Sequence, residues 1–326
     1  MANRMRRALL AQAAALALGG LPTLAAAGYP DKPVRLVVPF GAGGSADLLG
    51  RVIAEGLSAR LGQSVVVENR PGATGILGSL AVSRAEPDGH TLLLGYDGTM
   101  VIAPALKRDF PFDPRSDLRP VSKLADVGLI VAVHPSVPAK NIKELIDYSR
   151  TGAAKVSFAT PGVGSTAHMA GELLRLNAGM QWLHVPYASG SGKFVVDLVA
   201  GVTPAAYISV TTAAPYIKEG KIVGVGVPAA NRHRIVPDVP TFSEAGVQGQ
   251  DAASWFGLFA PAGTPDAIVE RLNDELAGLL QDRQVAEKLR NAALEPVGST
   301  PAQFAELIDA DLKKWDEVAR RAGLAD

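Results

Sequence analysis

The chain has 326 residues, no cysteine, and equal numbers of basic and acidic residues, 32 of each. The lack of cysteine excludes disulfides, thiolate metal sites and cysteine nucleophiles. A formal net charge of zero without a basic stripe argues against a nucleic-acid partner, and the length suffices for two domains of ordinary size.

Residues 1–27 have the layout of a secretory signal peptide. A basic start with three arginines precedes an apolar run over residues 8–21, and the A-x-A sequence at residues 25–27 precedes Gly28. The apolar run is shorter than the ~20 residues that a membrane span needs. We therefore expect a mature chain that starts at Gly28, is exported to the periplasm, and carries 29 basic against 32 acidic residues, a net charge of −3.

The segment after this leader predicts a βαβαβ unit. Residues 34–38, 65–67 and 91–94 are short apolar runs typical of buried strands. Residues 45–61 place leucine, isoleucine and valine at helical spacing, and a helix of small residues lies between the second and third strands. This order predicts a parallel, doubly wound sheet, which binds ligands at the carboxyl ends of its strands.

The rest of the chain predicts a second α/β unit and a return to the first. Residues 127–133 are expected to form a strand that crosses into a second domain, and residues 255–260 a strand that crosses back. Three amphipathic helices that end the chain are expected to pack on the first domain. The prediction is a first domain of residues 28–128 plus 254–326 and a second of residues 129–253, able to close about a hinge.

Two glycine-rich loops, one in each predicted domain, each join a strand to the start of a helix. The first N–H groups of a helix lack internal partners and its dipole makes that end mildly positive, so it suits an anion. Glycine lets the backbone approach a ligand closely. The candidate ligand residues are Gly43, Gly44, Ser45 and Asp47 on one side, and Gly162, Gly164, Ser165 and Thr166 on the other.

Two of these side chains have more than one interpretation. Ser45 is either the cap of its helix or a donor to a ligand carboxylate. Asp47 either balances the helix dipole or orients waters and loop groups in the cleft. Because a hydrogen bond to a charged partner contributes roughly 1.5–3 kcal/mol, several convergent bonds would give micromolar affinity without an arginine.

Two alternatives belong to other functional classes. The sequence Gly41-x-Gly43-x-x-Ala46 between strand and helix, with Glu68 after the next strand, fits a nicotinamide-dinucleotide site of an oxidoreductase. Export, a repulsive Asp47 in the first helical turn and the second loop count against it. An exported hydrolase is the other alternative, although no G-x-S-x-G elbow is present. The five histidines show no metal-ligand spacing, so no metal or cofactor is expected. Of the five, only His168, in the first turn after the second loop, is a candidate for lining the cleft.

Seven blocks of sequence together resemble the Bug family, the extracytoplasmic solute receptors of tripartite tricarboxylate transporters. Each block is weak alone, but their order is specific and spans nearly the whole mature chain. The blocks are residues 39–47, 69–73, 88–92, 162–168, 184–187, 237–246 and 260–265.

The resemblance implies a type II periplasmic-binding-protein fold, an α/β architecture with two doubly wound sheets joined by two crossing hinge strands. It implies a receptor without catalytic activity that grips a small carboxylate between the two loops, partly through waters, and it adds Phe40 and Thr160 to the candidate ligand residues, with Tyr187 nearby. A monomer is expected as the default for a receptor that must hinge. The membrane subunits of a tripartite tricarboxylate transporter would receive that ligand. Here residues 201–209 lack the acidic residue that often follows the aromatic one, which disfavours an amino-acid ligand, and Asp97 and Lys193 are unusual.

Overall fold

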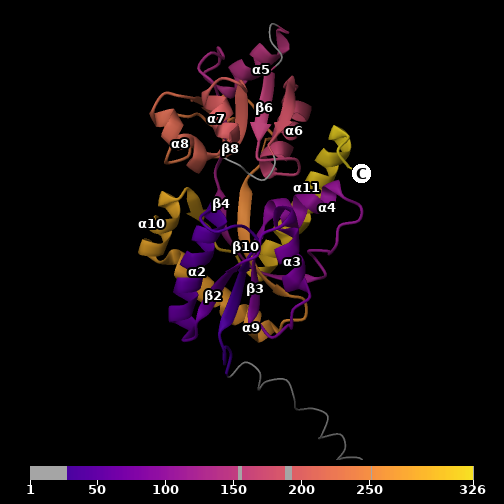
Figure 1. Ribbon diagram of the computed structural model, residues 1–326, viewed down its shortest axis with the longest axis vertical. Helices are drawn as coiled ribbons and strands as arrows, with labels where there is room; N and C mark the ends of the chain where they lie inside the picture. The colour runs from indigo at the N-terminus through magenta and orange to yellow at the C-terminus, as the bar shows by residue number, and fades with distance from the viewer. Residues whose placement is uncertain (1–27, 153–155, 188–192, 251, 326) are drawn as a thin grey trace, which may run out of the picture.

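The computed structural model describes residues 28–152, 156–187, 193–250 and 252–325, so the predicted signal peptide lies outside the described residues. These residues form two lobes stacked along the long axis of the molecule, as Figure 1 shows. No helix of the described ranges is both long enough and apolar enough to cross a bilayer.

The described segments alternate strands and helices along most of the chain. The strands are β1 (Val34–Val38), β2 (Val65–Asn69), β3 (Thr91–Tyr96), β4 (Leu118–Val127), β5 (Leu129–Val133), β6 (Val156–Thr160), β7 (Trp182–Pro186), β8 (Ala205–Ser209), β9 (Val223–Gly226), β10 (Ser254–Pro261) and β11 (Leu294–Pro296). The helices are α2 (Ser45–Leu61), η1 (Ala73–Gly75), α3 (Ile76–Ser83), η2 (Gly98–Ile102), α4 (Ala103–Leu106), α5 (Ile142–Arg150), α6 (Thr166–Ala178), α7 (Lys193–Val199), α8 (Val210–Lys218), α9 (Asp266–Gln281), α10 (Arg283–Asn291) and α11 (Pro301–Ala322).

The first lobe is built on a sheet with the strand order β11-β4-β10-β3-β1-β2. The strand β1 pairs in parallel with β2 and β3, as the βαβαβ pattern predicted. The helix α2 packs with α9 and α10 on one side, while α3, α4 and α11 lie on the other (Figure 1). Leu49, Ile53 and Leu57 of α2 are fully buried because they recur on one helical face; Leu48, expected on that face, is exposed.

The second lobe is built on a sheet with the strand order β7-β6-β8-β5-β9. Here β6 pairs in parallel with β7 and β8, whereas β5 runs antiparallel to β8 and β9. Helices follow the carboxyl ends of β6 and β8, so loops of this lobe face the first lobe at the same rim.

The two crossings lie close to the predicted positions but differ in detail. The apolar run 127–133 is two strands, because β4 ends at Val127 in the first sheet and β5 begins at Leu129 in the second. The return strand β10 lies wholly in the first sheet, antiparallel to β3 and β4. The two-lobed α/β fold is thus confirmed, while the residue-by-residue domain division stays a prediction.

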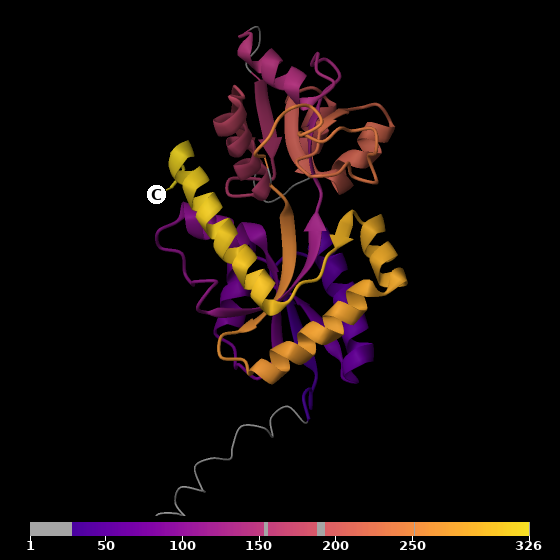
Figure 2. The same cartoon turned by 180° about the vertical axis from the view of Figure 1, so that it is seen from behind.

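The last helix departs from the expectation that the C-terminal helices pack on the first domain alone. The helix α11 contacts β4 and α4 of the first lobe and α6 of the second. Figure 2 shows it running obliquely from the first lobe to the flank of the second. Near its end, the Arg321 guanidinium donates to the Asn177 side-chain oxygen at 3.4 Å. One helix therefore touches both lobes.

Candidate functional site

The first loop, residues 39–44, joins β1 to α2 and lies open to solvent. Gly41, Gly43 and Gly44 are exposed, and Gly43 has a φ of +89°, a conformation that favours glycine. Gly44 is the N-cap of α2 and provides no side-chain cap, so Ser45 is the first helical residue and not the cap. The Ser45 hydroxyl is exposed and makes no hydrogen bond with the described residues.

The Asp47 side chain anchors the first loop through hydrogen bonds. One carboxylate oxygen of Asp47 accepts from the Gly43 N–H at 2.9 Å and from Arg51 Nε at 3.0 Å, and the other accepts from Asn69 Nδ2 at 2.9 Å. The Arg51 guanidinium, followed by the Gly43 N–H, lowers the pKa of Asp47 to about 2. The buried carboxylate therefore stays ionised and orients the loop, while the Gly43 N–H is occupied by protein.

The second loop, residues 161–165, joins β6 to α6 and is held together by its own polar groups. Ser165 caps α6: its hydroxyl oxygen accepts from the His168 N–H at 3.2 Å and its hydroxyl donates to the Gly162 carbonyl at 2.8 Å. The buried Thr160 hydroxyl oxygen accepts from the Gly162 N–H at 3.2 Å. Gly162 and Gly164 have φ values of +146° and +76°, which explains glycine at both positions.

Two histidines support the second loop from inside the lobe. The Nδ1 atom of His168 accepts from the Gly164 N–H at 3.3 Å, and His184 Nε2 lies 2.7 Å from the Thr160 hydroxyl. Burial lowers the pKa of both, to about 3 for His184. His168 is only 2% exposed, so it packs beneath the loop and does not line the cleft.

Tyr96, at the end of β3, connects the two loops. Its ring meets the ring of Phe40 edge-on, with centroids 5.6 Å apart. Its hydroxyl lies 3.0 Å from the Thr166 hydroxyl at the start of α6. The two loops, one from each lobe, are thus brought together across a single tyrosine side chain.

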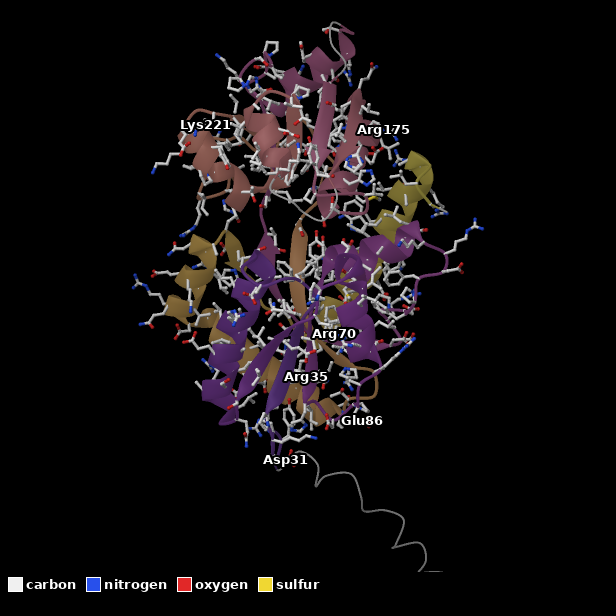
Figure 3. All side chains as sticks on the ribbon, viewed as in Figure 1. Asp31, Arg35, Arg70, Glu86, Arg175 and Lys221 are labelled. Atoms are coloured by element: carbon white, nitrogen blue, oxygen red, sulfur yellow. The ribbon has the colours of Figure 1, made fainter. Side chains whose placement is uncertain are left out.

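The hydroxyl of Tyr187, a residue predicted to lie near the ligand, is hydrogen-bonded within the second lobe. It donates to an Asp197 carboxylate oxygen at 2.6 Å, and Lys193 Nζ donates to the same oxygen at 2.7 Å. Lys193 therefore neutralises Asp197 instead of offering a free charge. The positive side chains Arg175 and Lys221 project from opposite flanks of the second lobe in Figure 3, away from the gap between the lobes.

The donors that remain uncommitted are mostly main-chain groups. At α2 these are the N–H groups of the first turn and the Ser45 hydroxyl; at α6 it is the N–H group of Ala167, because the Thr166 N–H is directed to the Tyr96 side chain. Beside Gly164, a hollow of about 270 Å³ lies between the lobes, with walls from Thr74, Leu106 and Val163. This arrangement can hold a small anion with an apolar portion.

Several residues of the site were not found from sequence. Asn69 and Ser254 are missing from the predicted set, and Asp97 was noted only as unusual, yet each hydrogen-bonds a predicted site residue or its partner. Asn69 lies in one of the recognised blocks, which was a usable signal. Ser254 carried no signal, because its partner Asp97 is 157 residues away in the chain.

The geometry also bears on the alternatives. In a dinucleotide site, the glycine turn must offer its N–H groups to a pyrophosphate, but that of Gly43 is bound by the Asp47 carboxylate. Glu68, the candidate for the ribose, lies 3.3 Å from Arg35 in an ion pair. Within the described ranges, no cluster of three or more His, Cys, Asp or Glu residues is arranged to hold a metal.

Comparison with known proteins identifies the family. Residues 49–324 match the model of the tripartite tricarboxylate transporter family receptor, TctC. The protein BugT of Bordetella pertussis is 34% identical over 296 residues, covering 90% of each chain.

Solved structures agree. A Rhodopseudomonas palustris protein, Rpa4515, solved with adipate, has a TM-score of 0.80 and 34% identity, covering 91% of this chain and 99% of that one. The periplasmic binding protein BugD has a TM-score of 0.76 at 33% identity with the same coverage. MatC from the same Rhodopseudomonas species, with bound malate, gives 0.75 at 32%, covering 89% and 99%. The chain described here therefore belongs to the TctC family, which includes the Bug proteins, and is a periplasmic-type solute-binding receptor, not an enzyme.

Proposed function

We propose that this receptor captures a small carboxylate between the first loop (residues 39–44) and the second loop (residues 161–165) as its lobes close, and delivers it to a tripartite tricarboxylate transporter. The supporting observation is that the first loop, through Phe40, and the start of α6 in the other lobe, through Thr166, both contact Tyr96. Relatives solved with adipate and malate support a carboxylate, and the family description supports the transporter.

The proposed contacts are the uncommitted donors. Ser45 offers a hydroxyl and a main-chain N–H, and Gly44 a further N–H; Ala167 offers an N–H group from the opposite lobe. Phe40 and the Tyr96 ring supply apolar contact. The roles of Gly43, Asp47, Thr160, Gly162, Gly164, Ser165 and Tyr187 are then to shape and hold the loops.

Thermal unfolding against a panel of solutes tests this proposal. The panel holds adipate, malate, succinate, citrate, an aromatic acid, aspartate and NAD. A ligand at 100 times its dissociation constant adds about 2.7 kcal/mol, which raises the melting temperature by several degrees at about 2–4 °C per kcal/mol. A shift with one carboxylate class is expected; a shift with NAD alone would overturn the proposal. Tighter binding of aspartate than of succinate would refute the expectation that an amino-acid ligand is disfavoured.

A matched pair of variants locates the site. Ser45→Ala removes an uncommitted hydroxyl from the first loop and should weaken binding of the best carboxylate by roughly tenfold. Ser64→Ala makes the same change at an exposed serine before β2, at the amino ends of the parallel strands and so at the opposite rim of the sheet, and should leave binding unchanged. Equal affinities of the two variants would place the ligand elsewhere.

We propose, further, that residues 1–27 are removed on export and that the mature receptor is a monomer in the periplasm. Mass spectrometry of the exported protein should give a chain starting at Gly28, and light scattering should give one chain per particle. A retained leader in the exported protein would refute the cleavage.

A further inference from the structure

The buried carboxyl group of Asp97 hydrogen-bonds both to the second lobe and to the return strand β10. Asp97 follows β3 in the first lobe and is only 1% exposed. One of its oxygens accepts from the Thr166 hydroxyl at 2.9 Å, at the first residue of α6 in the second lobe. The other accepts from the Ser254 hydroxyl at 2.9 Å, at the first residue of β10. Both oxygens are enclosed, so Asp97 is not available to pair with a ligand amine.

The hydroxyl chain around Asp97 accommodates either protonation state. With the carboxyl ionised, the Tyr96 hydroxyl donates to Thr166 and the Thr166 hydroxyl donates to Asp97. With the carboxyl protonated, Asp97 donates to Thr166, which donates in turn to Tyr96. The same oxygen atoms stay linked in both states, so taking up a proton requires only that hydroxyl hydrogens reorient.

Asp97 has no positively charged partner among the described residues. The titratable groups that act on it are Tyr96 on β3 and Asp311 on α11, and the Lys314 ammonium is paired with Asp311 at 3.4 Å, not with Asp97. None of the ion pairs among the described residues includes Asp97. Burial, with a smaller effect of the Asp311 charge, raises the pKa of Asp97 to about 7.

We propose that Asp97 is a positioning residue that couples the capture of a carboxylate to the uptake of one proton. This inference rests on the proposed function. Thr166 begins α6, whose first N–H groups are among the proposed ligand donors, so a bound carboxylate and an ionised Asp97 lie at the same helix start. Two anions in one buried place oppose each other. The ligand therefore favours the neutral carboxyl, and by linkage the protonated receptor binds the anion more tightly.

The proton balance follows directly. The ligand enters as an anion, the Asp97 carboxylate takes one proton from the acid form of the buffer, and the complex holds a neutral Asp97 with its O–H directed to Thr166. No covalent bond of the ligand changes. At a pH well below 7 the carboxyl is already neutral, so binding takes up no proton there.

Titration calorimetry with adipate, and with malate if adipate does not bind, tests the coupling. Measurements at pH 7.5 in phosphate and in Tris, whose ionisation enthalpies differ, give the number of protons taken up. We expect uptake of about half a proton or more for the wild-type receptor, and an affinity that falls by up to about tenfold per pH unit above pH 7. Asp97→Asn should show no uptake and a flat affinity from pH 6 to 9.

Two further variants sharpen the result. Ser254→Ala removes a donor to the ionised carboxyl, so the midpoint of the pH dependence should move to higher pH. Asp147→Asn, at an exposed carboxylate paired with Lys143, should leave proton uptake unchanged. Wild-type binding without proton uptake, or uptake retained in Asp97→Asn, would overturn this inference alone. Failure of every carboxylate to bind would overturn the proposed function as well.

Discussion

The imidazole rings of His168 and His184 stack beneath the second loop, with their centroids 3.9 Å apart. His168 accepts a hydrogen bond from Gly164, which requires an unprotonated Nδ1. A second positive charge at this distance would be strongly unfavourable, so both rings are neutral near pH 7. The conformation of the second loop therefore depends on two uncharged bases.

This pair predicts that the receptor loses stability in mild acid. Both histidines have lowered pKa values in the folded state, about 3 for His184, against 6.5 when unfolded. As pH falls below 6.5 the unfolded chain binds protons first, so the free energy of unfolding decreases down to the folded pKa. We expect a loss of about 1 kcal/mol from His184 between pH 7 and 5, since its partial exposure screens the effect, and a further loss in the same direction from His168.

Urea unfolding at pH 7 and pH 5 measures this loss. His184→Gln should reduce the difference between the two pH values, while Ser64→Ala should not alter it. An unchanged difference in His184→Gln would show that the acid sensitivity comes from other groups, such as His233, whose pKa burial also lowers.

Asp47→Ala should loosen the first loop. It removes the acceptor of Gly43, Arg51 and Asn69, and hydrogen bonds to a charged group contribute about 1.5–3 kcal/mol. We expect about 2 kcal/mol lower stability and weaker binding of the carboxylate. Asp147→Ala breaks an exposed ion pair with Lys143 and should change stability by less than about 0.5 kcal/mol. Equal urea midpoints for the two variants would contradict the anchoring role.

Comparison of Gly43→Ala with Gly41→Ala separates the effect of backbone strain on stability from the effect of steric clash. A Cβ at either position meets no atom within 4 Å, but only Gly43 has a positive φ, +89°. An alanine there should cost about 1 kcal/mol or more, because L residues are strained in this region. Gly41→Ala should be nearly neutral. Melting temperatures measure both; a larger loss for Gly41→Ala would refute the assignment.

Much of the fold was predictable from local patterns. The strands around residues 34–38 and 91–94 are continuous apolar runs, and the α2 pattern repeats at helical spacing until Gly62 ends the helix. The strand β4 was not predicted, because Pro120 and Lys123 interrupt its apolar pattern and pairing with β10 and β11 stabilises it. Local sequence cannot report such partners.

The same limit applies to the site. A glycine-rich segment between an apolar run and a helical pattern can be seen in the sequence, so the two loops were identified correctly as elements. The hydrogen-bond partner of each polar side chain could not be predicted from the sequence. Thr166 was expected to face the ligand, but its hydroxyl donates to Asp97, 69 residues away in the chain. Ser45 was expected as a possible cap, and only the backbone of Gly44 shows where the helix begins.

The helix α11 has a mechanical consequence. It has 22 residues, and at 1.5 Å per residue it forms a rod of about 33 Å that leans on β4 in one lobe and on α6 in the other. The lobes cannot swing apart on that flank without sliding α6 along the rod. We therefore expect the lobes to open by a rotation about this flank, with α11 as its fixed side.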